Sequence, residues 1–153
     1  MAHRYRAGVL HRVDTQDADL KALSEVEAVG AVAAYSQAFE NYQVDAALAV
    51  TVQLARACNQ LIESAAPWKL AKDPDQAGRL DAVLYHLAES IRIVAILLSP
   101  VLPEAARGIL AQLNVAAEPS LRDAGWGGLG NGHVLGSPVP LFPRLEAPVV
   151  AAD

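Results

Sequence analysis

The sequence has only one cysteine, Cys58, and no apolar stretch long enough to cross a membrane. A single cysteine cannot form an intramolecular disulfide, so the sequence is typical of a reducing compartment. The N-terminal segment is basic but has no apolar core, which argues against a secretory signal peptide. Together these absences predict a cytoplasmic protein.

An excess of positive charge is also absent. The formal net charge is −5, whereas a protein that binds nucleic acid on its own is usually basic. Any contact with a nucleic acid therefore has to be local, or has to be assisted by another domain.

The signatures of catalytic and metal sites are missing as well. The histidines have no metal-ligand spacing among themselves or with the cysteine; they are His3, His11, His86 and His133. Residues 125–130 read GWGGLG and match a dinucleotide-binding pattern, but a polar segment precedes them where a strand is required. We expect a loop there. The sequence predicts no catalytic group, bound metal or cofactor in this chain.

Helical periodicity is the main feature that is present. Apolar residues recur at helical spacing over residues 19–42, with Ala28, Val32, Tyr35, Phe39 and Tyr42, and over residues 44–62, with Val44, Leu48, Thr51, Ala55, Cys58 and Ile62. Asp73 and Pro74 indicate the start of another helix. Its core face is predicted to carry Leu80, Leu84, Leu87, Ile91, Val94 and Leu98, and its opposite face Arg79, His86 and Glu89.

Prolines and glycines divide the rest of the chain. Ser99 and Pro100 end the long helix, and Pro103 begins a shorter one that ends near Asn114, with Leu102, Ala106, Ile109 and Leu113 facing the core. A first short helix is expected to end near Gly8. We predict an all-α fold: an antiparallel helix bundle over residues 1–114 and an irregular Gly/Pro-rich arm over 115–148 that packs back on it. The arm has a short extended ribbon near 133–135, and residues 149–153 are predicted to be disordered.

Residues 59–72, NQLIESAAPWKLAK, contain the strongest functional pattern. Pro67 cannot continue the incoming helix, so Trp68 is presented where that helix stops, beside Lys69 and Lys72. An aromatic ring flanked by ammonium groups suits an unstacked base and its phosphates. The same pattern also fits a tryptophan that fills the end of a bundle beside solvated lysines. The residues alone favour this second interpretation, without excluding the first.

Several segments resemble the anticodon-binding domain of bacterial methionyl-tRNA synthetases, which are class I aminoacyl-tRNA synthetases. They are APWKLAK at 66–72, the preceding helix with Asn59, RIVAILLSPVLPEAA at 92–106, FENYQVDAAL at 39–48 and PLFPRLE at 140–146. Arg4, Tyr5 and Gly8 resemble the end of that domain's first helix, and Trp126 and Gly132 resemble its closing arm. The resemblance covers nearly the whole chain.

The resemblance implies a domain that reads the CAU anticodon of methionine tRNA. Trp68 would stack on an anticodon base, with Pro67 holding its turn, and Arg4 and Asn59 would lie near the same surface. We add Lys69 and Lys72 to these candidate anticodon-binding residues because they flank the ring. The implied partners are this tRNA and a catalytic domain, and no membrane or DNA is implied.

The resemblance also implies what the chain should lack. The family's catalytic domain uses ATP and Mg²⁺ to ligate methionine to its tRNA, and its HIGH and KMSKS signatures are absent here, so no activity is expected from this chain alone. An asparagine–arginine pair that reads the first anticodon base would lie upstream of Met1, which suggests a fragment or a split-gene product. A subunit that docks on a separate catalytic chain, and a helical interaction bundle without RNA binding, remain open alternatives.

Overall fold

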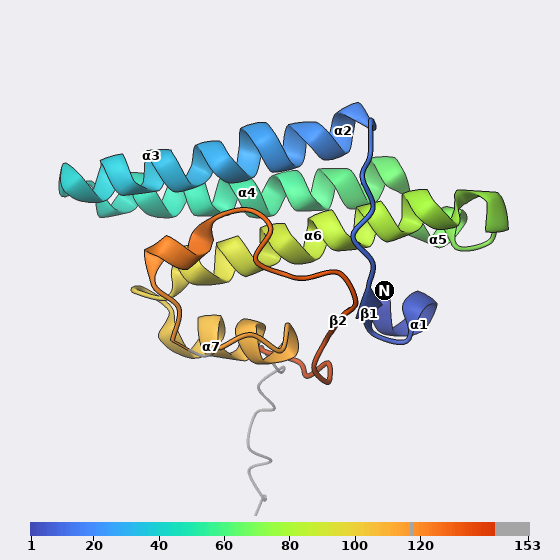
Figure 1. The fold of residues 1–153 in the computed structure, drawn as a ribbon. Coiled ribbons are helices and arrows are strands. Elements are labelled where there is room, and N and C mark those ends of the chain that lie inside the picture. The colour runs from blue at the N-terminus through green and yellow to red at the C-terminus, as the bar shows by residue number, and fades with distance from the viewer. Residues whose placement is uncertain (117, 143–153) are drawn as a thin grey trace, which may run out of the picture.

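The computed structural model describes residues 1–116 and 118–142 and shows long helices packed against one another (Figure 1). A continuous helical run consists of α2 (Ala18–Lys21), the π-helix η1 (Ala22–Ala28) and α3 (Val29–Glu40). The helix α4 (Val44–Ala65) returns antiparallel to it, and α6 (Ala77–Leu98) lies beneath this pair. The predicted all-α antiparallel bundle is confirmed.

Helix α6 is at the centre of the fold. It packs against α4, against the shorter helix α7 (Pro103–Gln112) and against the 3₁₀-helix η3 (Leu121–Ala124). Leu80, Leu84, Leu87 and Val94 are buried, as predicted. Arg79 is exposed, also as predicted, and Leu98 is partly buried against the core. Three assignments on this helix are wrong, because Ile91 is 38% exposed whereas His86 and Glu89 are only 7% and 0% exposed. The C-terminal arm and the segment before α2 cover the face that was expected to meet solvent.

Two further core assignments need correction. On α4, Thr51 and Cys58 are buried as predicted, but the other buried residues are Ala47, Leu54, Leu61 and Ala65, and Val44 is 44% exposed. Tyr42 was predicted to face the core but is 94% exposed, because α3 ends at Glu40 and Tyr42 lies in the turn to α4 with φ of 60°.

Local sequence signals determine where the later helices begin. Asp73 accepts a hydrogen bond from the backbone N–H of Asp75 at 3.0 Å, and Pro74 opens the 3₁₀-helix η2 (Pro74–Gln76) that leads into α6. Pro103 is the first residue of α7, as predicted, and Ala106 and Leu113 are buried. Leu102 was predicted to face the core but is exposed, because it precedes the first turn of α7.

The N-terminal segment and the C-terminal arm meet in a two-stranded ribbon. Helix α1 (Ala2–Arg6) ends before Gly8, as predicted, and Gly8 has a positive φ of 81° that favours glycine. Strand β1 (Val9–Leu10) then pairs antiparallel with β2 (His133–Val134), with Val9 opposite Val134. The extended ribbon expected near residues 133–135 is therefore present, and residues 125–130 form a loop after η3, as predicted.

The arm follows α6 and α7 closely. The Tyr85 hydroxyl donates to the Leu129 carbonyl at 2.9 Å, and the Gly136 N–H donates to the Gln112 carbonyl at 2.9 Å. A Cβ at Gly136 would lie 2.4 Å from the Ala111 carbonyl oxygen, so a larger residue cannot be placed there without moving the arm. The predicted remainder of the arm, 143–148, and the predicted disordered tail, 149–153, lie outside the described residues.

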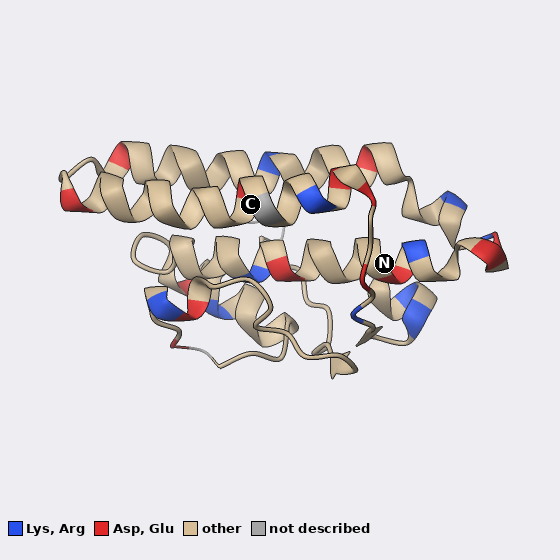
Figure 2. Ribbon diagram, turned by 45° about the horizontal axis from the view of Figure 1, so that its top comes forward, with Lys and Arg blue, Asp and Glu red and all other residues tan. Residues whose placement is uncertain are grey.

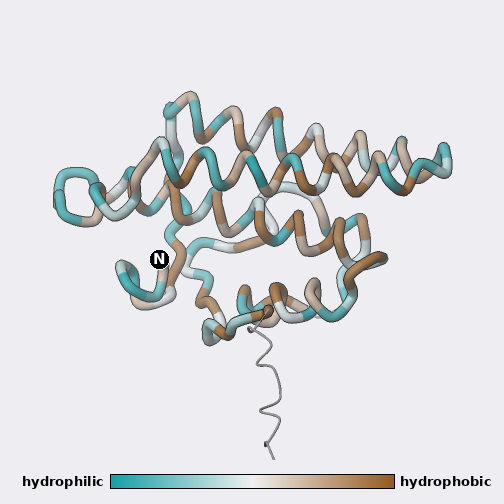
Figure 3. The backbone as a smooth tube through the Cα atoms, turned by 180° about the vertical axis from the view of Figure 1, so that it is seen from behind, coloured by the Kyte–Doolittle hydropathy of each residue, from teal (hydrophilic) through white to brown (hydrophobic). Residues whose placement is uncertain are grey.

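Hydrophobic and hydrophilic residues alternate along the long helices, as expected for elements that bury one side (Figure 3). Across residues 1–116 and 118–142, no helix has both the length and the hydropathy needed to cross a membrane.

Candidate functional site

The helix break after α4 determines how Trp68 is presented. Ala66 has a left-handed conformation, with φ of 44°, and its N–H donates to the Ile62 carbonyl at 3.1 Å. Pro67 is then the first residue of the short helix α5 (Pro67–Leu70), a position at which its missing N–H removes no hydrogen bond. The chain therefore changes direction sharply, one residue before Trp68.

Helix α5 is anchored on one side and open on the other. Pro67 and Leu70 are buried against the bundle, whereas Lys69 is exposed and Trp68 is 44% exposed. A tryptophan that filled the end of the core would be buried, so this degree of exposure does not fit that interpretation. An indole ring held at a rigid helix end can offer its face to a flat ligand with little loss of conformational entropy.

Two lysines lie close to Trp68 in the sequence, within and just after α5. Lys69 and Lys72 are exposed and form no ion pair within the described residues. Figure 2 shows further Lys and Arg positions on α1 and at the start of α6, together with Asp and Glu positions in the turn between α5 and α6 and at the start of α6. Lys69 and Lys72 therefore stand near exposed carboxylates, among them Asp73 and Asp75, and any attraction to phosphates at this end is local.

Arg4 lies on α1, a different helix from the one that carries Trp68. Its guanidinium carbon lies 5.6 Å from the centre of the Tyr5 ring, and its side chain is exposed. The neighbouring Arg6 fixes α1 to the start of α6, because it pairs with Asp81 and donates to the Ala77 carbonyl at 3.1 Å. Arg6 is thus a structural contact, and Arg4 faces solvent.

Asn59 lies outside α5 and the turn that follows it. It is exposed on α4, six residues before the helix ends at Ala65, which places it about 9 Å back along the axis. The structure thus brings Pro67, Trp68, Lys69 and Lys72 together within α5 and the turn that follows it, whereas Arg4 and Asn59 project from two other helices.

A buried polar network was missed by the sequence analysis. Glu89 accepts hydrogen bonds from Arg92 at 2.9 and 2.7 Å and a third from the Leu129 N–H, and Arg92 also donates to the Asp123 and Gly125 carbonyls. This network attaches the arm to α6. The available signal was the pair of opposite charges one turn apart on an otherwise apolar helix.

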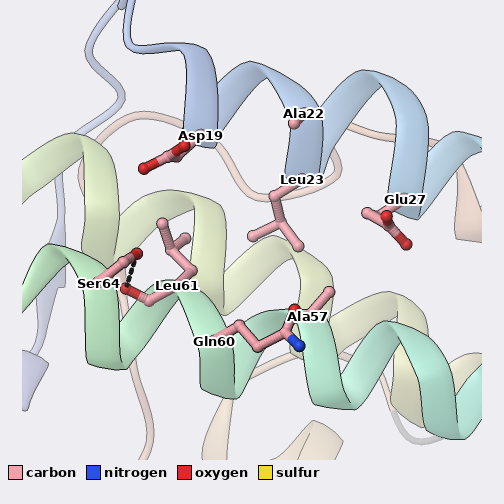
Figure 4. Close-up of a pocket in the computed structure, with 8 residues that line it drawn as sticks. All are labelled: Asp19, Ala22, Leu23, Glu27, Ala57, Gln60, Leu61 and Ser64. Carbon is pink, nitrogen blue, oxygen red and sulfur yellow. Dashed lines mark hydrogen bonds between the residues drawn. The ribbon is translucent and has the colours of Figure 1, made fainter.

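The hollow between η1 and α4 is unsuited to a nucleic acid. Its volume is about 260 Å³, and Asp19 of α2 and Glu27 of η1 lie on one side of it, opposite Gln60 and Ser64 of α4 (Figure 4). Carboxylates at this position would repel phosphates. Nor do the described residues contain a cluster of three or more side chains that could hold a metal ion.

Comparison with known proteins gives consistent results. Residues 13–151 match the family model described as the anticodon binding domain of methionyl tRNA ligase. The chain is 42% identical over 121 residues to the methionine–tRNA ligase of Bacillus subtilis, covering 76% of this chain and 18% of the relative. It is 32% identical over 154 residues to the corresponding ligase of a Nostoc species, covering 95% of this chain and 29% of the relative.

Solved structures show the same similarity. The apo form of Mycobacterium tuberculosis methionyl-tRNA synthetase superposes with a TM-score of 0.86 at 27% identity, covering 97% of this chain and 30% of that one. The same synthetase in complex with methionyl-adenylate also gives a TM-score of 0.86, covering 94% and 28%. This chain therefore spans less than a third of each of these relatives.

Proposed function

This chain belongs to the family of the anticodon-binding domain of methionyl-tRNA ligases, and we propose that it recognises the CAU anticodon of methionine tRNA. The observation that carries the proposal is the half-exposed Trp68 on α5, held by two buried neighbours and flanked by lysines. Stacking of a base on an aromatic side chain contributes roughly 1–3 kcal/mol.

The other candidate residues have different proposed roles in binding the anticodon loop. Pro67 fixes the turn that presents the indole, and Lys69 and Lys72 neutralise phosphates of the anticodon loop. Stacking alone does not distinguish bases, because every base has a π-face. Arg4 and Asn59 therefore contact base edges, where a guanidinium donates and an amide both donates and accepts hydrogen bonds.

We further propose that this chain acts together with a catalytic domain, in the same polypeptide or in a separate one. That domain uses ATP and Mg²⁺ to ligate methionine to the tRNA. No step of this reaction is assigned to the residues of this chain, which contribute recognition of the tRNA only.

Binding of a fluorescent anticodon stem-loop, followed by anisotropy, tests the recognition step. Trp68→Ala is expected to weaken binding by about ten- to a hundredfold, because roughly 1.4 kcal/mol corresponds to a factor of ten. Tyr42→Ala is the matched control, because Tyr42 is an exposed aromatic residue in the turn between α3 and α4, far from α5.

A stem-loop with a changed anticodon serves as the specificity control. The proposal expects weaker binding of the changed stem-loop to the wild-type chain, and a smaller difference in the Arg4→Ala or Asn59→Ala variants. Equal binding by the wild-type, Trp68→Ala and Tyr42→Ala chains would rule out the proposed role of Trp68. A thermal melt of each variant separates lost binding from lost folding.

A further inference from the structure

A small polar cavity lies away from α5, at a junction of separate chain segments. Its volume is about 140 Å³. Its walls come from the segment between β1 and α2, from α2 and η1, from α6 and from the arm; the lining residues used below are Arg12, Asp14, Thr15, Lys21, His86 and Trp126. None of them belongs to the proposed anticodon surface.

The cavity contains two cationic side chains. Arg12 forms no ion pair within the described residues, and its guanidinium carbon lies 5.9 Å from the centre of the Tyr85 ring. The Lys21 ammonium group donates to the Gln16 side-chain oxygen at 2.6 Å, which leaves two of its three N–H groups for a ligand. Asp14 is the only carboxylate among the lining residues.

His86 forms part of the inner wall. Its Nδ1 lies 2.8 Å from the Ala82 carbonyl oxygen, so Nδ1 carries a proton and donates it in a hydrogen bond. The ring of Trp126 packs against His86 with 5.4 Å between ring centres. Nε2 of His86 can therefore accept a hydrogen bond while the ring is neutral, and it becomes a donor when the ring gains a second proton.

We propose that this cavity is a binding site for a single phosphate group. An arginine fork matches the geometry of phosphate oxygens, and a lysine adds a point charge beside it. The Thr15 hydroxyl can donate a further hydrogen bond. A hollow of about 140 Å³ has room for a small tetrahedral anion. It is too small for a nucleoside, since ligand pockets usually exceed about 300 Å³.

The phosphate can come from either of two sources, an RNA backbone or free phosphate in solution. The RNA source rests on the proposed function, whereas the free-phosphate source does not depend on it. Both use the same donors, so the site is tested first with inorganic phosphate and then with RNA.

His86 makes the site sensitive to pH. Burial lowers the pKa of His86, and the charge of Arg12 lowers it further, whereas the hydrogen bond to Ala82 and the charges of Asp17 and Glu89 raise it. Asp14, Lys21 and Tyr85 also line the cavity. A bound phosphate would favour the protonated imidazole, so the pKa of His86 is expected to rise when the site is filled.

The first experiment is a titration of the full chain with inorganic phosphate, followed by ¹H–¹⁵N NMR against chloride at matched ionic strength. The indole N–H signal of Trp126 should shift saturably, while that of Trp68 on α5 should not. Arg12→Gln should weaken binding about tenfold, as expected for the loss of one charge-assisted contact. Asp14→Asn should tighten binding, because it removes the opposing charge.

The control variant is Arg107→Gln on α7, whose side chain is half exposed and pairs with Glu104. It removes the same charge from the chain and should leave phosphate binding unchanged. Lys21→Gln provides a second test within the cavity, and it decides the outcome if Arg12→Gln alters the folded spectrum. Absence of a saturable Trp126 shift, or equal effects of the Arg12 and Arg107 variants, would overturn the proposal.

The second experiment identifies the source. If the site takes an RNA phosphate, Arg12→Gln should weaken stem-loop binding and inorganic phosphate should compete with the RNA. If the site takes free phosphate, Arg12→Gln should leave stem-loop affinity unchanged, while inorganic phosphate still shifts the Trp126 signal of the wild-type chain. If the anticodon proposal is wrong, the wild-type chain will not recognise the stem-loop. The titration with inorganic phosphate would still give the same result, so the two proposals fail separately.

Discussion

Glu89 and Arg92 form an ion pair inside the bundle, one helical turn apart, with their side chains 0% and 3% exposed. The pair is completed by the arm, because Glu89 accepts from the Leu129 N–H and Arg92 donates to two carbonyls near η3. A Cβ at Gly128 would lie 2.5 Å from the guanidinium carbon of Arg92, so the loop approaches this side chain as closely as a glycine allows.

We predict that removing one member of this pair is severely destabilising. Glu89→Ala should lower the free energy of unfolding by about 3–5 kcal/mol, because it leaves a buried guanidinium without its partner. Urea denaturation measures the change. The double variant Glu89→Ala/Arg92→Ala should cost less than the sum of the single variants, because the two residues are coupled.

The control is an ion pair with the same three-residue spacing on the surface of the protein. Glu104 and Arg107 also pair one turn apart, on α7, but their side chains are 85% and 50% exposed. Glu104→Ala should therefore cost far less, since exposed ion pairs are screened by solvent. Similar costs for Glu89→Ala and Glu104→Ala would show that burial does not determine the strength of the first pair.

We predict that His86 makes stability depend on pH. Burial lowers the pKa of His86 in the folded state, so the unfolded chain binds a proton more readily. Its contribution is complete above the unfolded pKa of about 6.5 and is lost as pH falls through the lower folded pKa. Thermal melts between about pH 7.5 and 5 should show this loss in the wild-type chain.

His86→Gln should remove this part of the pH dependence. His11→Gln is the control, because His11 is exposed in the segment before α2. An unchanged pH profile in His86→Gln would show that other groups are responsible. The comparison is made without phosphate, so that an anion in the neighbouring cavity does not raise the pKa of His86.

We predict that truncating two apolar residues one turn apart on α6 lowers the free energy of unfolding by very different amounts. Leu87→Ala should cost about 2–5 kcal/mol, because Leu87 is buried and its truncation leaves a cavity. Ile91→Ala should cost much less, because Ile91 is 38% exposed and its neighbours can relax into solvent. Denaturant titrations check both values, and equal costs would contradict the observed orientation of α6.

We predict a shallow salt dependence for binding of the anticodon stem-loop. Few free cations lie near Trp68, and each neutralised phosphate contributes about 0.7 to 0.9 to the slope of log affinity against log salt. Lys69→Gln and Lys72→Gln should each reduce the slope by about that amount. Arg107→Gln, with its charge on α7, should not change it, and a steep slope that neither lysine variant reduces would place the phosphate contacts elsewhere.

The helix ends were predictable from the sequence because their causes are local. A proline lacks an N–H and an aspartate caps the N-terminal turn, so Pro67, Asp73 and Pro103 mark boundaries wherever the helices pack. The π-helical stretch η1 was not predictable, because no residue type in Ala22–Ala28 requires it. The turn at Tyr42 was not predictable from periodicity, because an aromatic residue at helical spacing is typical of a core position.

The solvent-facing sides of α6 could not be predicted from helical periodicity alone. Periodicity indicates which residues share a face, but not whether a later segment of the chain covers it. His86 and Glu89 were assigned to solvent for this reason, and the arm and the segment before α2 bury them. The α5 residues were predictable as a group, but the sequence left open whether Trp68 is buried.

The ribbon between β1 and β2 has a consequence for the order of folding. It joins segments that are far apart in the chain: Arg12 donates to Asn131 across 119 positions, and His3 to Gly136 across 133. Contacts of such separation form slowly, so we expect the α3–α4–α6 helices to assemble before the arm attaches. During that interval Glu89 and Arg92 would face water, and their charges would keep this surface of α6 hydrated until the arm covers it.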